Sequence, residues 1–240
     1  MNHYASLPMY DWPETRDQVD QFYAQLRAYV PSLPGSLCRP DSEDALQALW
    51  RDPRLVLSQT CWGPLSAGLS RYVNVLAQPL YDDVPGGVGV RYRSAIVMRE
   101  GVRCPVPDHD GARLPHGLSG LRAAVNGPDS LSGCIALVQD SGVHGLLATA
   151  LVTGSHRASI RAVADGAADF AAIDCRSWAL ATEHEPAARA LVVTGWTCLR
   201  AGLPYITARA TPLALRQELA KALGRFGARQ QLQSQSEGSQ

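Results

Sequence analysis

The sequence is short of lysine, of closely spaced cysteines and of long apolar runs. Lys221 is the only lysine, so a Schiff-base mechanism is excluded everywhere except near the C-terminal end. The six cysteines include no C-x-x-C pair, which excludes the usual zinc spacings and a disulfide framework. Free thiols in a reducing compartment are the favoured interpretation. No apolar run approaches the roughly 20 residues of a membrane helix, so we expect no membrane span.

Net charge is also absent. The 22 basic and 22 acidic residues cancel, which excludes broad electrostatic attraction to nucleic acid or to acidic lipid. The first ten residues lack a basic region followed by an apolar stretch. As written, the chain is therefore expected not to be exported by a signal peptide and to be cytoplasmic. Its 240 residues suffice for one large domain or two small ones with a real core.

Short β-like runs alternate with helical stretches along most of the chain, which indicates an α/β fold with parallel-rich sheets flanked by helices. Residues 4–9 predict a first strand, and the apolar spacing of residues 13–29 predicts a helix. A last amphipathic helix is expected to open at Thr211-Pro212 and to end near Phe226. The Gln- and Ser-rich tail, residues 231–240, is expected to be disordered.

Three predicted strand-to-helix turns are rich in small and hydroxyl residues: 58–63, 130–133 and 153–156. Such turns line the crevice at the carboxyl ends of strands, and unpaired N–H groups at helix starts attract anions. The alternative is that Asp129, Ser130, Ser132 and Ser155 simply cap helices. Three similar turns in one chain favour an oxyanion site.

An ordered set of segments resembles a known family: ASLPMY (5–10), QTC (59–61), YRS (92–94), AAVN (123–126) with SLSG (130–133), TGSHRAS (153–159) and AAIDC (171–175). Together they are similar to the substrate-binding proteins of phosphate, phosphite and phosphonate ABC transporters, over roughly residues 4–210. The resemblance implies a type II periplasmic-binding fold, in which two lobes joined by two crossovers close on a ligand. The implied lobes are residues 1–92 with 198–230, and residues 93–197, the second holding the anion.

The resemblance also implies the site residues. Hydroxyls and backbone amides at helix starts hold the anion in this family, which points to Ser130, Ser132, Ser155 and His156, with Tyr92 closing from the connection side. Leu131 departs from the pattern because the family often has a hydroxyl residue there, so only its backbone N–H remains. Trp62-Gly63 reverses a more usual order, which puts the first-lobe wall in doubt. Exported members of the family carry signal peptides, so the resemblance implies a periplasmic location that the chain as written does not.

The remaining candidate positions carry alternatives. His156 could donate to a phosphoryl oxygen or could be a capping or surface residue. Asp174 could bind a cationic part of the ligand or cap the helix that follows it. The other candidates are residues that end strands or belong to the turns: Tyr10, Thr60 and Thr153.

We expect reversible binding of a small oxyanion (phosphate, phosphite or phosphonate), as the substrate-binding part of an ABC-type uptake system, with an ABC permease as partner. The sequence offers no catalytic constellation, no metal cluster and no phosphate-binding P-loop or dinucleotide motif, so we expect no enzyme, no cofactor and a monomer. Two alternatives stay open. One is a cytosolic enzyme of the same fold that acts on a small carboxylate or phosphonate, and the other is a sensor derived from a binding protein.

Overall fold

The computed structural model describes residues 3–100, 103–104, 106–142, 145 and 148–229. Its helices are α1 (Arg16–Tyr29), α2 (Glu43–Arg51), α3 (Trp62–Ser66), η1 (Leu69–Arg71), η2 (Leu131–Ile135), α4 (Ala136–Ser141), α5 (His156–Ala164), α6 (Cys175–His184), η3 (Pro186–Ala190) and α7 (Leu213–Arg225). Its strands are β1 (Tyr4–Ala5), β2 (Leu55–Gln59), β3 (Val73–Ala77), β4 (Gly87–Val88), β5 (Arg91–Tyr92), β6 (Ser94–Met98), β7 (Ala123–Val125), β8 (Leu151–Val152), β9 (Phe170–Asp174), β10 (Val192–Trp196), β11 (Arg200–Ala201) and β12 (Tyr205–Ala208).

The first sheet has the order β1-β2-β12-β3 and is covered by helices on both faces. On one face, Leu26 of α1 and Leu223 of α7 pack with Leu57 of β2. On the other face, Trp50 of α2 and Leu65 of α3 pack with Ile206 of β12. Strand β2 is buried along its whole length because both of its faces are covered. Burial of these apolar side chains holds this half of the molecule together.

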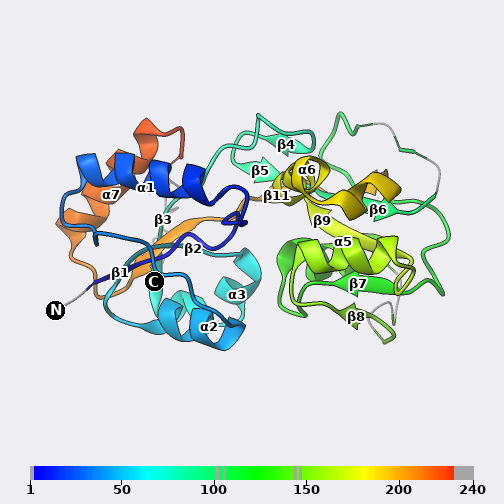
Figure 1. Ribbon diagram of the computed structural model, residues 1–240, viewed down its shortest axis with the longest axis horizontal. Coiled ribbons are helices and arrows are strands. Elements are labelled where there is room, and N and C mark those ends of the chain that lie inside the picture. Colours follow the sequence, from blue (N-terminus) through cyan, green and yellow to red (C-terminus); the bar gives the residue numbers. More distant parts are fainter. Residues whose placement is uncertain (1–2, 101–102, 105, 143–144, 146–147, 230–240) are drawn as a thin grey trace, which may run out of the picture.

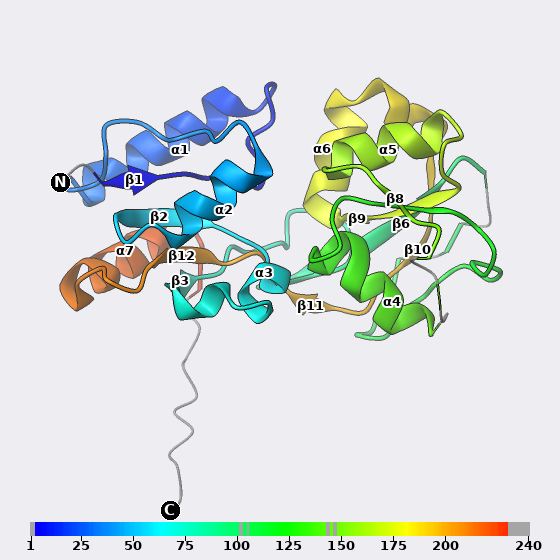
Figure 2. The same ribbon diagram turned by 90° about the horizontal axis from the view of Figure 1, so that it is seen from below.

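The second sheet has the order β10-β6-β9-β7-β8. Ile160 and Val163 of α5 pack with Ile173 of β9 on one face. Leu137 of α4 and Phe170 of β9 pack on the other. In Figures 1 and 2 the two sheets lie in two halves, side by side along the long axis of the molecule. A third sheet, β11-β5-β4, forms where the chain passes between the halves after β3 and again before β12.

The α/β class predicted from the sequence is confirmed, and both large sheets contain parallel pairs: β1–β2, β7–β8 and β7–β9. The sheets are mixed, however. β12 runs antiparallel to β2 and β3, and β6 runs antiparallel to β9 and β10. The chain forms β6 and β12 directly after it has crossed between the two halves. Each of these strands therefore enters its sheet from the end opposite to that of its neighbours.

Two element boundaries differ from the sequence prediction. The first strand stops at Ala5, because Pro8 has no N–H to continue the ladder beyond the bond from Ser6 to Leu57. The first helix begins at Arg16, because the Thr15 hydroxyl accepts from the Trp12 N–H and donates to the Tyr10 carbonyl, which fixes a turn before the helix. The predicted disordered tail, 231–240, lies outside the described residues. Among the described residues, no helix has the length and apolar character needed to cross a membrane.

Candidate oxyanion site between the two halves

The turn before η2 presents two serine hydroxyls from the second half. Ser130 Oγ accepts from the Gly133 N–H at 3.2 Å, so Ser130 caps the helix. Its hydroxyl also lies 3.4 Å from Ser132 Oγ. The Ser94 hydroxyl donates to the Ser132 carbonyl at 2.9 Å, which fixes the turn against β6. Both serines are buried.

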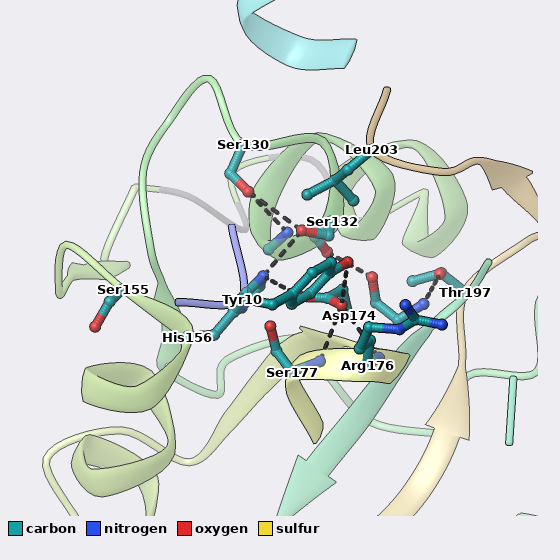
Figure 3. Close-up of polar contacts among 12 residues, drawn as sticks. Tyr10, Ser130, Ser132, Ser155, His156, Asp174, Arg176, Ser177, Thr197 and Leu203 are labelled. Carbon is teal, nitrogen blue, oxygen red and sulfur yellow. Dashed lines mark hydrogen bonds and ion pairs between the residues drawn. The ribbon is translucent and has the colours of Figure 1, made fainter. Parts of the chain in front are cut away.

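His156 is the first residue of α5, and its side chain points at the serine turn. Its Nε2 lies 3.0 Å from Ser132 Oγ and 3.2 Å from Asp174 Oδ2 (Figure 3). A carboxylate only accepts, so the geometry assigns a proton to Nε2. The other ring nitrogen, Nδ1, is buried and has no hydrogen-bond partner. Burial lowers the pKa of His156 below its ordinary value, and the Asp174 charge opposes that shift only in part.

Asp174 ends β9 and is 2% exposed. Its Oδ1 accepts from the backbone N–H groups of Arg176 and Ser177 at 3.1 and 3.0 Å, so it caps α6. The same oxygen accepts from the Tyr10 hydroxyl at 3.2 Å. Tyr10 belongs to the first half, so this contact joins the two halves at the cluster. Burial, and after it the Asp174 charge, raises the pKa of Tyr10 well above its usual value.

The first half closes on the serine turn through the start of α3. Gly63 has no side chain, and a Cβ built there would lie 1.7 Å from the Asp129 carbonyl oxygen. Glycine is therefore required, because two backbones meet there. The neighbouring Cys61 sulfur lies against the N–H groups of Leu131 and Ser132, and burial raises its thiol pKa. These amides face the first half.

Two further hydroxyls near the cluster are buried without a hydrogen-bond partner. One is Tyr92 Oη, which faces Ser132 and Cys61, and the other is Thr60 Oγ1. An unpaired buried hydroxyl is unfavourable unless something supplies the missing partner. Burial raises the pKa of Tyr92 well above its usual value, so this hydroxyl is a donor at any ordinary pH.

The structure thus brings together five of the residues predicted from the sequence: Tyr10, Ser130, Ser132, His156 and Asp174. Tyr92 and the backbone of Leu131 border this group, and Thr60 stays outside its hydrogen bonds. Thr153 Oγ1 is used locally, by the Val125 and Ser155 carbonyls and by Ser159. Ser155 Oγ accepts from the Ala158 N–H and points away from the cluster in Figure 3.

Sequence reasoning missed Tyr81, Arg176 and the position of Cys61. The Tyr81 hydroxyl lies 3.2 Å from Tyr10 Oη, and the Arg176 guanidinium lies over both tyrosine rings at 4.8 and 5.7 Å. Arg176 lies two residues after Asp174, the cap of α6, and this position was a usable signal. Tyr81 lies in a turn-rich segment with no pattern that marks it.

In the described part of the chain, no group of three or more His, Cys, Asp or Glu side chains is arranged to hold a metal ion.

A family model described as the periplasmic substrate-binding protein of phosphonate ABC transporters matches residues 68–238. The chain belongs to this family. The match covers most of the chain and includes every member of the cluster except Tyr10. The family is one of transport components that bind a substrate, and its members are periplasmic. No curated protein sequence matches the chain.

Solved structures with the same fold include members of this phosphonate-binding family. The binding-protein component of an ABC phosphonate transporter from Pseudomonas aeruginosa is 16% identical, with a TM-score of 0.65 over 94% of this chain and 74% of that one. PhnD1 from Prochlorococcus marinus, solved with methylphosphonate, is 18% identical, with a TM-score of 0.62 over 91% and 82%. A histidine kinase sensor domain similar to periplasmic binding proteins is 14% identical, with a TM-score of 0.60 over 94% and 92%. At these identities the likeness shows the fold, a type II periplasmic-binding fold.

Proposed function

We propose that this protein reversibly binds a small phosphorus oxyanion between its two halves, at the turn formed by residues 130–133. The observation that carries the proposal is the meeting of Ser132 Oγ and His156 Nε2 at 3.0 Å, from the starts of two different helices. Both groups are polar, and both lie where Tyr10 and Cys61 of the first half close on the second. Hydrogen bonds from such groups to an anion are charge-assisted and therefore strong.

Two hydroxyl groups at the turn have a proton available for a ligand. The Ser132 hydroxyl accepts a hydrogen bond from the Nε2–H group of His156, which leaves its own proton for another partner. Its nearest other hydroxyl neighbour is that of Ser130, at 3.4 Å. The Tyr92 hydroxyl is buried and faces Ser132 without a hydrogen bond of good geometry. A phosphorus oxyanion presents its oxygens in a tetrahedral arrangement to donors that come from different elements, whereas the two oxygens of a carboxylate lie in one plane. This favours phosphonate, phosphite or phosphate over a carboxylate ligand.

The same atoms argue against an enzyme. Ser132, His156 and Asp174 are the residue types of a hydrolytic triad, in which the acid binds one ring nitrogen and the serine binds the other. Here both contacts are to Nε2, and Nδ1 has no partner. With a proton on Nε2, the ring has no lone pair there to accept the serine proton, so His156 is not placed to act as a general base for Ser132. The arrangement supports binding without covalent chemistry.

The proposal places the protein as the substrate-binding component of an ABC uptake system, as a monomer that docks on a permease. The lobe boundaries predicted from the sequence, 1–92 with 198–230 and 93–197, belong to the proposal. Membership of the two large sheets supports them, since β1, β2, β3 and β12 lie in the first range and β6 to β10 in the second. Closure of one lobe on the other then accompanies ligand binding.

Titration calorimetry with phosphate, phosphite and methylphosphonate tests the proposal, with ³¹P spectra of each mixture recorded after long incubation. We expect saturable binding of at least one oxyanion and an unchanged phosphorus spectrum. Appearance of a new phosphorus species would favour the enzyme alternative. Absence of binding by all three oxyanions would contradict the proposed function.

A further inference from the structure

A cavity of about 330 Å³ lies between the two halves, beside the serine turn. The first half lines it with Met9, Leu46 and Trp50, and the second half lines it with the segment 126–130 and with Val152. Its walls are formed by both halves, so their closure creates it. None of the residues discussed as a direct oxyanion donor, apart from Ser130, lines it.

Three residues connect this cavity to the oxyanion cluster. Ser130 lines the cavity, and its hydroxyl lies 3.4 Å from Ser132 Oγ. Cys61 lines the cavity, and its sulfur lies against the Leu131 and Ser132 amides. Asn126 lines the cavity and packs on the cluster from behind, since a Cβ built on Gly133 would lie 1.9 Å from Asn126 Oδ1 and 3.2 Å from His156 Cε1. A group attached to an oxyanion at the serine turn would therefore lie next to the cavity.

The walls of the cavity have an apolar part and a polar part. The ring of Trp50 is available as an apolar wall because its Nε1 already donates to Ser58 at 3.1 Å. Leu46, Met9 and Pro64 extend this wall. The polar part includes the Ser130 hydroxyl and three acceptors: the carboxylates of Glu43 and Asp129, and Asn126 Oδ1, which is buried without a partner. Of the described residues that line the cavity, none is basic.

We propose that this cavity receives the organic substituent of the bound oxyanion, and that the preferred ligands are organophosphonates whose substituent is apolar and carries no negative charge. The inference rests on the proposed function, because the phosphonate group itself must sit at the serine turn. An apolar substituent gains affinity from Leu46 and Trp50. A substituent with a second negative charge meets Glu43 and Asp129 and finds no cation, so it is rejected.

The test compares phosphite, which has no substituent, with methyl-, propyl- and phenylphosphonate and with phosphonoacetate. Each methylene moved from water to an apolar wall raises affinity about fourfold, so propylphosphonate should bind more tightly than methylphosphonate by roughly tenfold. Phosphonoacetate should bind more weakly than propylphosphonate by at least that factor. Asp129→Asn should reduce this difference in affinity between phosphonoacetate and propylphosphonate.

Two variants that fill the cavity, one from each half of the molecule, provide a second test. Leu46→Trp fills the cavity from α2, and Val152→Trp fills it from a side chain that is 61% exposed, so the second variant is tolerated even if the first destabilises the fold. Both should abolish the advantage of propyl- and phenylphosphonate and leave phosphite affinity within about twofold. If oxyanions bind but affinity does not depend on the substituent, or the filling variants do not change that dependence, the cavity inference is wrong and the proposed function stands. If no oxyanion binds the wild type, both are wrong.

Discussion

Arg157 of α5 and Glu14 of the first half form an ion pair with two parallel hydrogen bonds, at 2.9 and 2.8 Å. The Arg157 guanidinium also lies 4.8 Å from the Trp12 ring centroid, and its Nε donates to the buried Glu185 at 2.6 Å. Arg157 directly follows His156. The pair therefore ties the segment before α1 to the helix start that supplies a candidate ligand-binding side chain, and it holds the halves together beside the site.

Neutralising this pair should loosen closure. The Arg157 hydrogen bonds lower the pKa of Glu14 to about 2, so the carboxylate is charged, and the pair is intact, at every pH above that value. Glu14→Gln should increase the radius of gyration of the ligand-free protein and weaken oxyanion binding by up to about fivefold, as for an exposed ion pair. Small-angle scattering and calorimetry measure the two effects.

Glu218→Gln is the matched control, since Glu218 is an exposed carboxylate on α7, which packs against α1 and β3 of the first half. It should change neither quantity. Scattering curves and affinities that agree between the two variants would show that the Glu14–Arg157 pair has no part in closure.

The serine turn should carry a large part of the affinity. Ser130→Ala and Ser132→Ala each remove one charge-assisted hydrogen bond to the oxyanion, so each should raise the dissociation constant roughly 10- to 100-fold. Ser155→Ala is the control, because it removes a helix cap that lies outside the cluster. It should lower the free energy of unfolding by about 1 kcal/mol with little effect on affinity. A larger loss of affinity from Ser155→Ala than from Ser132→Ala would place the anion at the other turn.

Binding should depend on pH through His156. Burial lowers its pKa in the ligand-free protein, and a bound anion raises it, so the complex takes up a proton between the two values. For a fixed ionic form of the ligand, affinity is then highest at low pH and falls as pH rises through the bound-state pKa. The ligand titrates as well, and its dianion prefers the donors, so the wild-type profile contains two opposing trends. His156→Gln keeps a donor without titrating, and parallel profiles for the two proteins between about pH 5.5 and 8 would assign His156 no role in binding.

The same shift predicts how stability depends on pH. Because the folded-state pKa of His156 lies below its unfolded value of about 6.5, the unfolded chain takes up the proton first as the pH falls. The contribution of neutral His156 to stability is therefore present above about pH 6.5 and is lost below it. His156→Gln should flatten this part of the melting-temperature profile, and a saturating oxyanion should reverse its sign in the wild type.

A substitution of Asp174 separates two roles of its carboxylate, which are to cap α6 and to bind a cationic group of the ligand. Asp174→Asn keeps an oxygen that accepts from the Arg176 and Ser177 amides, so α6 stays capped. It removes a negative charge beside the proposed anion, so methylphosphonate affinity should rise by about tenfold. If the carboxylate also binds an ammonium group of the ligand, 2-aminoethylphosphonate affinity falls in the same variant. A rise for both ligands identifies Asp174 as a cap and a holder of His156, and a fall for methylphosphonate would contradict the placement of the anion.

The sequence predicted the α/β class and the turns because both depend on local signals. Hydrophobic spacing and cap residues such as Ser42, Ser155 and Asp174 mark helices within a few residues. The antiparallel strands β6 and β12 were less predictable, since their direction is set by where the chain passes between the halves. The ordered motifs also indicated the serine turn, His156 and Asp174.

What the sequence does not contain is the pairing across the halves. Tyr10 meets Asp174 across 164 positions, and Glu14 meets Arg157 across 143. Neither pair has a spacing signature. Gly63 is another position whose role is not visible in the sequence. It must be glycine because of a contact with Asp129 that only the folded chain creates. Ser155 looked equivalent to Ser132 in sequence, yet only Ser132 points into the cluster.

The most direct test of the account is a crystal structure of the protein grown with methylphosphonate at a concentration well above its measured dissociation constant. The account predicts phosphonate oxygens within hydrogen-bond distance of Ser132 Oγ and His156 Nε2, with the methyl group directed toward Cys61 and the cavity beyond it. A phosphonate bound elsewhere in the molecule, with Ser132 and His156 still in contact only with each other and with Asp174, would contradict it.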